Sequence, residues 1–277
     1  MQKIKHFLRA INAENIKEWK IEISYKTDFI RTFIEPIVYL LPYFFYGLAV
    51  VGGRHSDYLK KLTGYSDIIT YILLGYVLMG FLGTACWAMG MAIRKELWYG
   101  TLESVFVAPV PRWVYIAGMA LHSTLHQGLI MIFQTIVIAL SFKIVLNLKN
   151  IWVALIPLIL MVLSLYGLGI LIAGLTLLVK QGWTISEAVY TLLTVITPIA
   201  YPLSVMPDFL QKVSKLSPTT YGILGVRYFL IGEKIPFSIE SVFIRLIISI
   251  FVLTIFGFSI FLTIDKKLRK TGTLSHY

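Results

Sequence analysis

The sequence has little charge. Only 14% of its 277 residues are Asp, Glu, Lys or Arg, against roughly 25% in soluble domains. Hydrophobic residues make up 57% of the chain, and the mean hydropathy is +0.79. A soluble domain of this length would need more polar surface, so the composition predicts an integral membrane protein. The net charge of +11 then indicates membrane topology and anionic lipid head groups rather than nucleic acid.

Cysteine is almost absent as well. Cys86 is the single one, so an internal disulfide and a cysteine-based metal site are excluded. The first 20 residues lack the continuous apolar core of a cleaved signal peptide, and we expect the later apolar runs to drive insertion. Those runs do not alternate apolar and polar residues, which excludes the strands of a membrane barrel.

Six apolar runs are present, and they predict an all-α membrane protein with a single transmembrane domain over residues 1–277. All but the fifth meet the roughly 20 residues that a membrane helix needs. The fifth is broken by Pro198 and Pro202. The predicted spans are 29–51, 68–93, 114–142, 151–179, 188–205 and 242–264.

Residues 1–25 have a different pattern. Apolar residues recur there at helical spacing, while charged residues occupy the remaining surface. This pattern predicts an amphipathic helix in the membrane interface, and the alternative is a solvated helical tail. The apolar positions are Ile4, Phe7, Leu8, Ile11, Trp19 and Ile23, and the charged ones are Glu14, Lys17, Glu18, Lys20 and Glu22.

Basic residues are concentrated at the two ends of the chain, before residue 32 and after residue 265. Such clusters resist translocation, and six spans put both termini on one side, so we expect both termini in the cytoplasm. Residues 94–113 are then cytoplasmic. Residues 203–241 are external, and their apolar stripe predicts a re-entrant hairpin.

The segment 94–113, RKELWYGTLESVFVAPVPRW, is polar between two apolar spans. It has few helix breakers between Glu96 and Ala108 apart from Gly100, and Pro109 and Pro111 then stop a helix. We therefore predict a short, rigid amphipathic helix just under the membrane. A simple connection would need only a few polar residues, so a cytoplasmic partner is expected to dock there.

The run from Glu96 to Glu103, ELWYGTLE, followed by Ala108-Pro109-Val110, resembles the coupling-helix signature of type-2 ABC exporter permeases. The resemblance extends over essentially the whole chain. It continues in the later segment with Pro198, Tyr201, Pro202, Met206-Pro207, Leu216-Ser217-Pro218 and Arg227.

This resemblance implies a plasma-membrane permease that works as a dimer, each copy resting on one ATP-binding subunit. The residues that it assigns to coupling are Glu96, Gly100, Thr101, Leu102, Glu103 and Pro109. The sequence contains no G-x-x-x-x-G-K-[ST] phosphate loop. We therefore expect ATP and Mg²⁺ on the partner subunit, no cofactor in this chain and no enzymatic activity of its own. The implied cargo is a drug-like hydrophobic compound or a lipid-linked glycan, and the start of the first span, FIRTFIEPIVYLLPYF, looks more like the drug-export branch.

Two helical faces carry hydroxyl groups. One consists of Tyr39, Tyr43 and Tyr46 in the first span; the other consists of Tyr190, Thr194, Thr197 and Tyr201 in the fifth. Hydroxyls facing lipid tails would be unpaired, so both faces are expected to turn toward protein or a translocation path. Packing alone would explain either face; a path is the equal alternative, because in the family that the chain resembles spans 1, 2 and 5 border the route between the two permeases.

Other chemistry is sparse. His122 and His126 have the spacing of two metal ligands on a helix, but interhelical hydrogen bonding is the preferred interpretation because no acidic third ligand is near in the sequence. Glu35 at the start of the first span is expected to pair with Arg31, four residues earlier, although it could bind cationic cargo. A membrane-embedded enzyme or an ion-coupled secondary transporter are the alternative functions.

Overall fold

Five helices are long and apolar enough to cross a membrane in the computed structural model, which describes residues 2–144, 148–179 and 182–271. This part of the chain contains no β-strand, so the prediction of an all-α membrane protein is confirmed. The long helices are α2 (Lys26–Val51), α4 (Ile68–Gly83) with the π-helical turn that continues it (Thr84–Met89), α7 (Arg112–Phe142), α8 (Ile151–Thr176) and α12 (Ile239–Thr271).

The amphipathic helix α1 (Gln2–Ser24) and several shorter helices complete the fold. Two of the helix starts have evident local causes: the Ser56 hydroxyl accepts a hydrogen bond from the Leu59 N–H, and the Asp67 carboxylate accepts from the N–H groups of Ile69 and Thr70. The shorter helices are α3 (Asp57–Thr63), α5 (Ala92–Tyr99), α6 (Leu102–Val107), α9 (Gly182–Ile196), α10 (Asp208–Ser214) and α11 (Pro218–Ile231).

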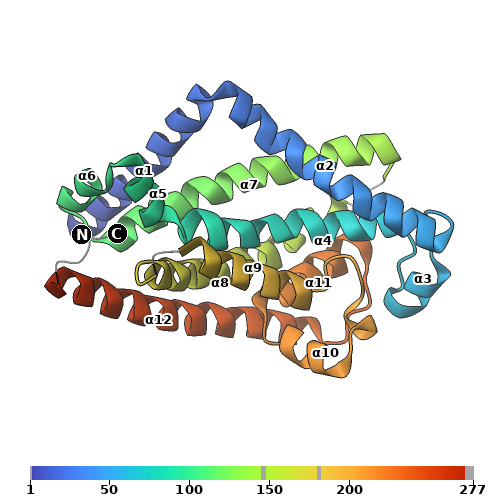
Figure 1. Ribbon diagram of the computed structural model, residues 1–277. Helices are drawn as coiled ribbons and strands as arrows, with labels where there is room; N and C mark the ends of the chain where they lie inside the picture. Colours follow the sequence, from blue (N-terminus) through green and yellow to red (C-terminus); the bar gives the residue numbers. More distant parts are fainter. Residues whose placement is uncertain (1, 145–147, 180–181, 272–277) are drawn as a thin grey trace.

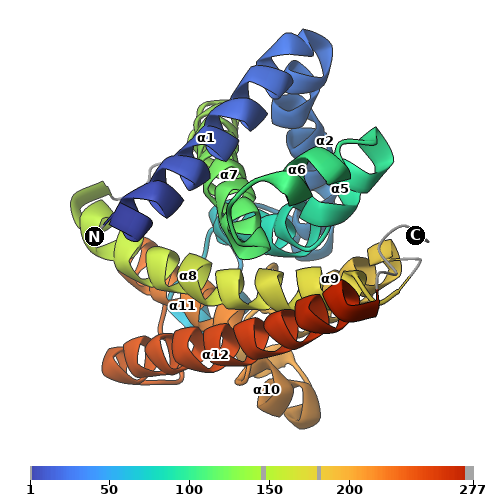
Figure 2. The same cartoon turned by 90° about the vertical axis from the view of Figure 1, so that its left-hand side faces the viewer.

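Helix α4 is the central element of the bundle. It contacts α2, α7, α8, α9 and α11, and most of its side chains are buried. Helix α12 packs along α8 in the most extensive contact between two helices, and α1 lies across α7 (Figures 1 and 2). Lipid tails are as apolar as leucine, so helix–helix association in the membrane is stabilised by close packing and buried polar contacts more than by the hydrophobic effect.

The fifth span, predicted at 188–205, is replaced by a shorter helix that begins earlier, α9. Helix α9 has 15 residues and ends at Ile196, just before Pro198. Such a helix is about 22 Å long, shorter than the roughly 30 Å hydrocarbon core. Helix α9 therefore does not cross the membrane as a continuous helix, because the prolines that follow it stop the chain from extending it.

The two ends of the bundle carry different elements. The start of α1 and the end of α12 lie at the same end as α5 and α6, while α3 lies at the opposite end (Figure 1). Helices α10 and α11 occupy the predicted hairpin segment, and nearly all of α11 is buried against α8, α4 and α12. The start of α1, the end of α12 and the segment 94–113 thus lie on one side of the bundle, as the sequence predicts, while the side of the membrane stays a prediction.

Candidate functional site

The segment 94–113 is divided by a break at Gly100. Gly100 has a φ of 70°, a left-handed conformation that glycine adopts without strain. Its N–H bonds the Leu97 carbonyl at 3.2 Å, and the Thr101 N–H bonds the Glu96 carbonyl at 2.9 Å, which closes the end of α5. The predicted single helix over Glu96 to Ala108 is therefore divided in two: Glu96 belongs to α5, and the second helix is α6, Leu102–Val107.

Helices α5 and α6 form a segment at the surface, and apolar side chains on one side of it pack against the bundle. Leu102 and Val105 pack against the buried cluster that includes Ile93 and Ile116. The opposite side is exposed, including large side chains that a monomeric soluble surface would seldom show together. The exposed residues are Trp98, Tyr99, Gly100, Thr101, Glu103, Ser104, Val107 and Pro109. We call these eight residues the docking surface.

Behind the docking surface, α1 lies on α7 with its charged face turned inward. Glu18 is 1% exposed, whereas Ile4 and Leu8 on the other side are 64% and 60% exposed. The prediction that the charges of α1 occupy its outer surface is therefore wrong for Glu14, Lys17 and Glu18. Partners from α5 and α7 receive them instead. The exposed apolar face remains available for the predicted membrane interface.

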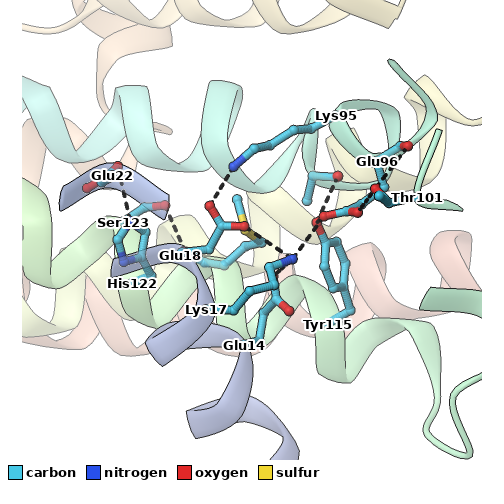
Figure 3. Close-up of polar contacts among 12 residues, drawn as sticks. Glu14, Lys17, Glu18, Glu22, Lys95, Glu96, Thr101, Tyr115, His122 and Ser123 are labelled. Carbon is cyan, nitrogen blue, oxygen red and sulfur yellow. Dashed lines mark hydrogen bonds and ion pairs between the residues drawn. The ribbon is translucent and has the colours of Figure 1, made fainter. Parts of the chain in front are cut away.

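Lys17 is the centre of this inward face (Figure 3). Its ammonium lies 2.7 Å from a Glu14 oxygen, 3.3 Å from a Glu18 oxygen and 2.9 Å from a Glu96 oxygen. Lys95 of α5 donates a further hydrogen bond to Glu18. The N-terminal helix is thus joined to α5 by two lysine–carboxylate links, one in each direction.

Glu96 receives three hydrogen bonds in this cluster, from Lys17, Thr101 and the Tyr115 hydroxyl at 2.8 Å. Burial works to raise the pKa of Glu96, but these donors outweigh it and hold the pKa below its usual range. Glu96 is 5% exposed, so its carboxylate faces the interior and not the docking surface. The structure therefore connects the predicted coupling residue Glu96 to α1 and α7 within its own chain.

Burial acts in opposite directions on the pKa values of Glu14 and Lys17. Burial raises the pKa of Glu14 to about 7, although Lys17 opposes the shift. Burial works to lower the pKa of Lys17, but hydrogen bonds to Glu14 and Glu96 outweigh it and raise that pKa. Lys17 therefore stays charged at neutral pH, while Glu14 is partly protonated there.

We name the residues Glu14, Lys17, Glu18, Lys95, Glu96 and Tyr115 the polar cluster. Oxygens of Glu14, Glu18 and Glu96 lie within 4.8 Å of one another, the only such convergence of possible metal ligands in the described residues. The Lys17 ammonium lies among them, in the position that a cation would take. The arrangement is therefore an internal ion-pair network.

A cavity of about 1100 Å³ adjoins both the polar cluster and the docking surface. Its walls come from α1, from the start of α2 and from α5–α6, and they include Lys20, Glu22, Asp28, Tyr99 and Ser104. Tyr99, Thr101 and Ser104 of the docking surface therefore lie at the edge of a depression that reaches toward α1.

His122 and His126 of α7 face α1 and α2. Glu22 of α1 lies 3.1 Å from His122 Nε2 and 3.6 Å from His126 Nδ1, and the Thr32 hydroxyl lies 3.3 Å from His126 Nε2. Trp19 packs edge-on against both rings. The preferred interpretation, polar contacts between helices, is confirmed, and the acidic neighbour missing from the local sequence comes from 100 residues earlier.

The tyrosines of α2 lie on the outside of the chain. Tyr39, Tyr43 and Tyr46 are 60%, 53% and 74% exposed, and Tyr43 approaches Tyr76 of α4 with ring centroids 5.9 Å apart. At the start of the same helix, Arg31 pairs with Glu35 at 3.2 Å, as the sequence predicts. The tyrosine face has no covering element within the described chain, so its role in a path stays a prediction.

The predicted face of α9 is divided by the structure. Tyr190 and Thr194 are half-buried, and Tyr201 is 37% exposed. Thr197 is fully buried, with its hydroxyl 2.6 Å from that of Thr219 in α11. In this conformation Thr197 is a packing contact, and only Tyr190, Thr194 and Tyr201 could line a path.

The chain belongs to the ABC-2 type transporter family, whose sequence pattern matches residues 11–231. This membership and the apolar helices define a multi-pass membrane transport permease. The chain is 26% identical over 216 residues to proteins described as "Inner membrane transport permease YadH", from Escherichia coli K12, Escherichia coli O157:H7 and Shigella flexneri. Each alignment covers 77% of this chain and 81% of the relative.

Sequence reasoning missed two parts of the site. The sequence does not predict the Lys17–Glu96 and Lys95–Glu18 pairs, because the charged face of an amphipathic helix usually points toward water. The spacing of Glu14, Glu18 and Glu22 four residues apart was the available signal, since it puts three carboxylates on one helix face. The partners of Glu18 and Glu22 on other helices, Lys95, His122 and His126, are 77 to 104 residues away and carried no local signal.

Proposed function

We propose that this chain is the membrane subunit of an ATP-driven exporter and that the docking surface binds a separate ATP-binding subunit. The observation that carries this proposal is the exposure of Trp98, Tyr99, Glu103 and Val107 on a segment whose other side is anchored in the bundle. Aromatic residues are enriched where proteins bind one another. Because the sequence has no phosphate loop, ATP and Mg²⁺ would be held by that partner.

The polar cluster gives the docking surface a route to the rest of the chain. Glu96 lies two residues before Trp98 in the same helix. It is hydrogen-bonded to α1 through Lys17 and to α7 through Tyr115. A displacement of α5 by the partner would therefore act on both helices at once. Both termini and the docking surface would face the cytoplasm, and α3 and α10 would face outward, as the terminal basic residues favour.

A second copy of the chain would complete the transporter, as the family resemblance implies. The exposed tyrosine face of α2 and the accessible residues of α9 would then border a path for a hydrophobic or amphipathic cargo, such as a drug-like compound or a lipid-linked glycan. Tyrosine rings suit either class, because they stack on apolar or sugar rings and still offer a hydroxyl.

The experiment is recovery of the ATP-binding subunit with affinity-tagged chain. Glu103→Lys reverses an exposed charge on the docking surface, and we expect roughly five- to tenfold weaker binding, the effect of about 1 kcal/mol at the edge of an interface. Glu240→Lys is the matched control, because Glu240 is also exposed but lies at the start of α12, away from α6. Equal recovery and equal ATP-coupled transport with Glu103→Lys would refute this role, as would parental chain that recovers no ATP-binding protein.

A further inference from the structure

Arg227 in α11 is buried completely, with 0% of its surface exposed. Its guanidinium donates to the carbonyl of Pro198 at 2.9 Å, to that of Tyr71 at 2.6 Å and to that of Ile199. The same group lies over the Tyr71 ring at 3.7 Å from its centroid. One side chain therefore joins α11, α4 and the segment that follows α9.

The break after α9 explains why a guanidinium is needed there. A helix that stops at a proline leaves carbonyls without intrahelical donors, and such groups are costly away from water. Arg227 supplies several donors in a fixed planar fork, which a lysine ammonium cannot reproduce. Gly75 makes the approach possible, because a Cβ at that position would collide with the Ile199 carbonyl and with the guanidinium.

The charge of Arg227 is balanced across the Tyr71 ring. The Tyr71 hydroxyl donates to Glu233 at 2.8 Å, and Glu233 is 2% exposed. Burial raises the pKa of Glu233, while Arg227 and the Tyr71 hydrogen bond oppose the shift. The guanidinium over the ring face and the carboxyl group at the ring hydroxyl thus form one buried polar group between α11, α4 and the connection to α12.

Helix α9 has few fully buried residues, although Ile185, Val189, Tyr190 and Leu193 pack partly buried against the apolar core. Of its 15 residues, Gly182, Ser186 and Ile196 are buried, and Trp183, Leu192 and Val195 are 53%, 59% and 51% exposed. Beyond Ile196 the chain is held by hydrogen bonds from Arg227 and by the Thr197–Thr219 hydroxyl contact, while Ile199 and Ala200 pack partly buried against the apolar core. The hydrogen bonds are the contacts of this segment that can be remade with water.

We propose that Arg227 is a positioning residue for transport: it holds the Pro198 end of α9 closed against α4 and α11, and this end opens when its carbonyls leave the guanidinium. The inference rests on the proposed function, in which Tyr190, Thr194 and Tyr201 border the path. The Arg227 joint, defined as Arg227 with the carbonyls of Tyr71, Pro198 and Ile199, is then the outer closure of that path.

The test uses labelling of a cysteine placed at Thr194 by a membrane-impermeant maleimide, in a Cys86→Ser chain and without nucleotide. Arg227→Lys keeps the charge but loses the fork, so labelling should rise about fivefold, the change that one net hydrogen bond makes in an open-to-closed ratio. Arg245→Lys is the control, because Arg245 is exposed and its guanidinium bonds only side-chain oxygens, those of Ser241 and Tyr221. Parental labelling in an Arg227→Lys chain that accumulates normally would overturn the proposal.

A second measurement keeps Arg227 and covers the case in which its variant does not accumulate. Cysteines at Thr197 and Thr219 should form a disulfide, because the two hydroxyls are in contact. In the complex, a non-hydrolysable ATP analogue should lower the disulfide yield severalfold if the joint opens, and an unchanged yield would overturn the proposal. Recovery of the ATP-binding subunit is checked beforehand, so loss of that subunit counts against the proposed function, whereas labelling at position 194 still decides the joint.

Discussion

Removal of the Lys17 ammonium is the most direct perturbation of the polar cluster. Lys17→Met keeps a side chain of similar length but leaves Glu14, Glu18 and Glu96 facing one another, with Lys95 bound to Glu18 alone. Loss of one partner from a buried ion pair costs about 3–5 kcal/mol. The Lys17 side chain is 37% exposed, so water screens part of this, and we expect about 2 kcal/mol against the attachment of α1.

Hydrogen exchange along α1 measures that attachment. A loss of about 2 kcal/mol corresponds to roughly 30-fold faster exchange of amides that are protected only while α1 lies on α7. Lys20→Met removes the same charge one turn later, where the side chain is exposed, and should change exchange less than about twofold. The pair of variants separates the ion-pair network from a general effect of net charge.

The effect should depend on pH through Glu14. Its pKa in the folded chain is raised to about 7 from 4.5, so the stability that its protonation contributes is complete below about 4.5 and is lost as the pH rises through 7. Above pH 7 Glu14 is charged and needs Lys17; at pH 6 it is mostly neutral and needs it less. The acceleration caused by Lys17→Met should therefore be smaller at pH 6 than at pH 8, and Glu14→Gln should relieve part of it at pH 8. Equal acceleration at both values, or an equal effect of Lys20→Met, would refute this reasoning.

Two further predictions concern the path and the orientation. Tyr190→Ala and Tyr201→Ala should change which cargo stimulates ATP hydrolysis by the complex, whereas Tyr58→Ala, an exposed tyrosine of α3, should keep the parental profile; variants at 190 and 201 that keep the profile but lose dimer stability would make this face a packing surface. In a Cys86→Ser background, an impermeant maleimide should label cysteines at Lys60 and Lys212 in sealed cells and spare one at Glu103, and strong labelling at 103 would contradict the proposed orientation.

The sequence predicts those features that depend on neighbours in the chain. Long apolar runs locate the spans that become α2, α4, α7, α8 and α12, because span length is set by the bilayer and not by tertiary contacts. The Arg31–Glu35 pair follows from helical spacing, and the short polar segment at 94–113 follows from its composition. The same local reasoning overestimated α9, since it counted residues beyond Pro198 that no longer belong to the helix.

Features that depend on distant partners were not predictable in this way. The inward turn of the charges on α1 requires Lys95, Glu96 and His122, none of which is close to α1 in the sequence. The role of Arg227 requires carbonyls exposed by a helix break 28 residues earlier and a glycine 152 residues earlier. A lone arginine in an otherwise apolar stretch was the signal for such a joint, because a buried charge must find several partners.

The polar cluster and the Arg227 joint are linked by consecutive helical segments, with a turn at Gly90 and Met91 before α5. Helix α4, its π-helical continuation and α5 run from Tyr71 and Gly75, which meet Arg227, to Glu96, which meets Lys17. The 25 residue steps from Tyr71 to Glu96 would span about 37 Å at α-helical rise, comparable to or more than the roughly 30 Å hydrocarbon core. Most of α4 is buried and closely packed, so a displacement of α5 by a cytoplasmic partner that passes the turn at Gly90 and Met91 would be carried along α4. The two ends where movement is least costly are then the two polar contacts, because hydrogen bonds and ion pairs can be remade with water, whereas separated apolar helices leave a void.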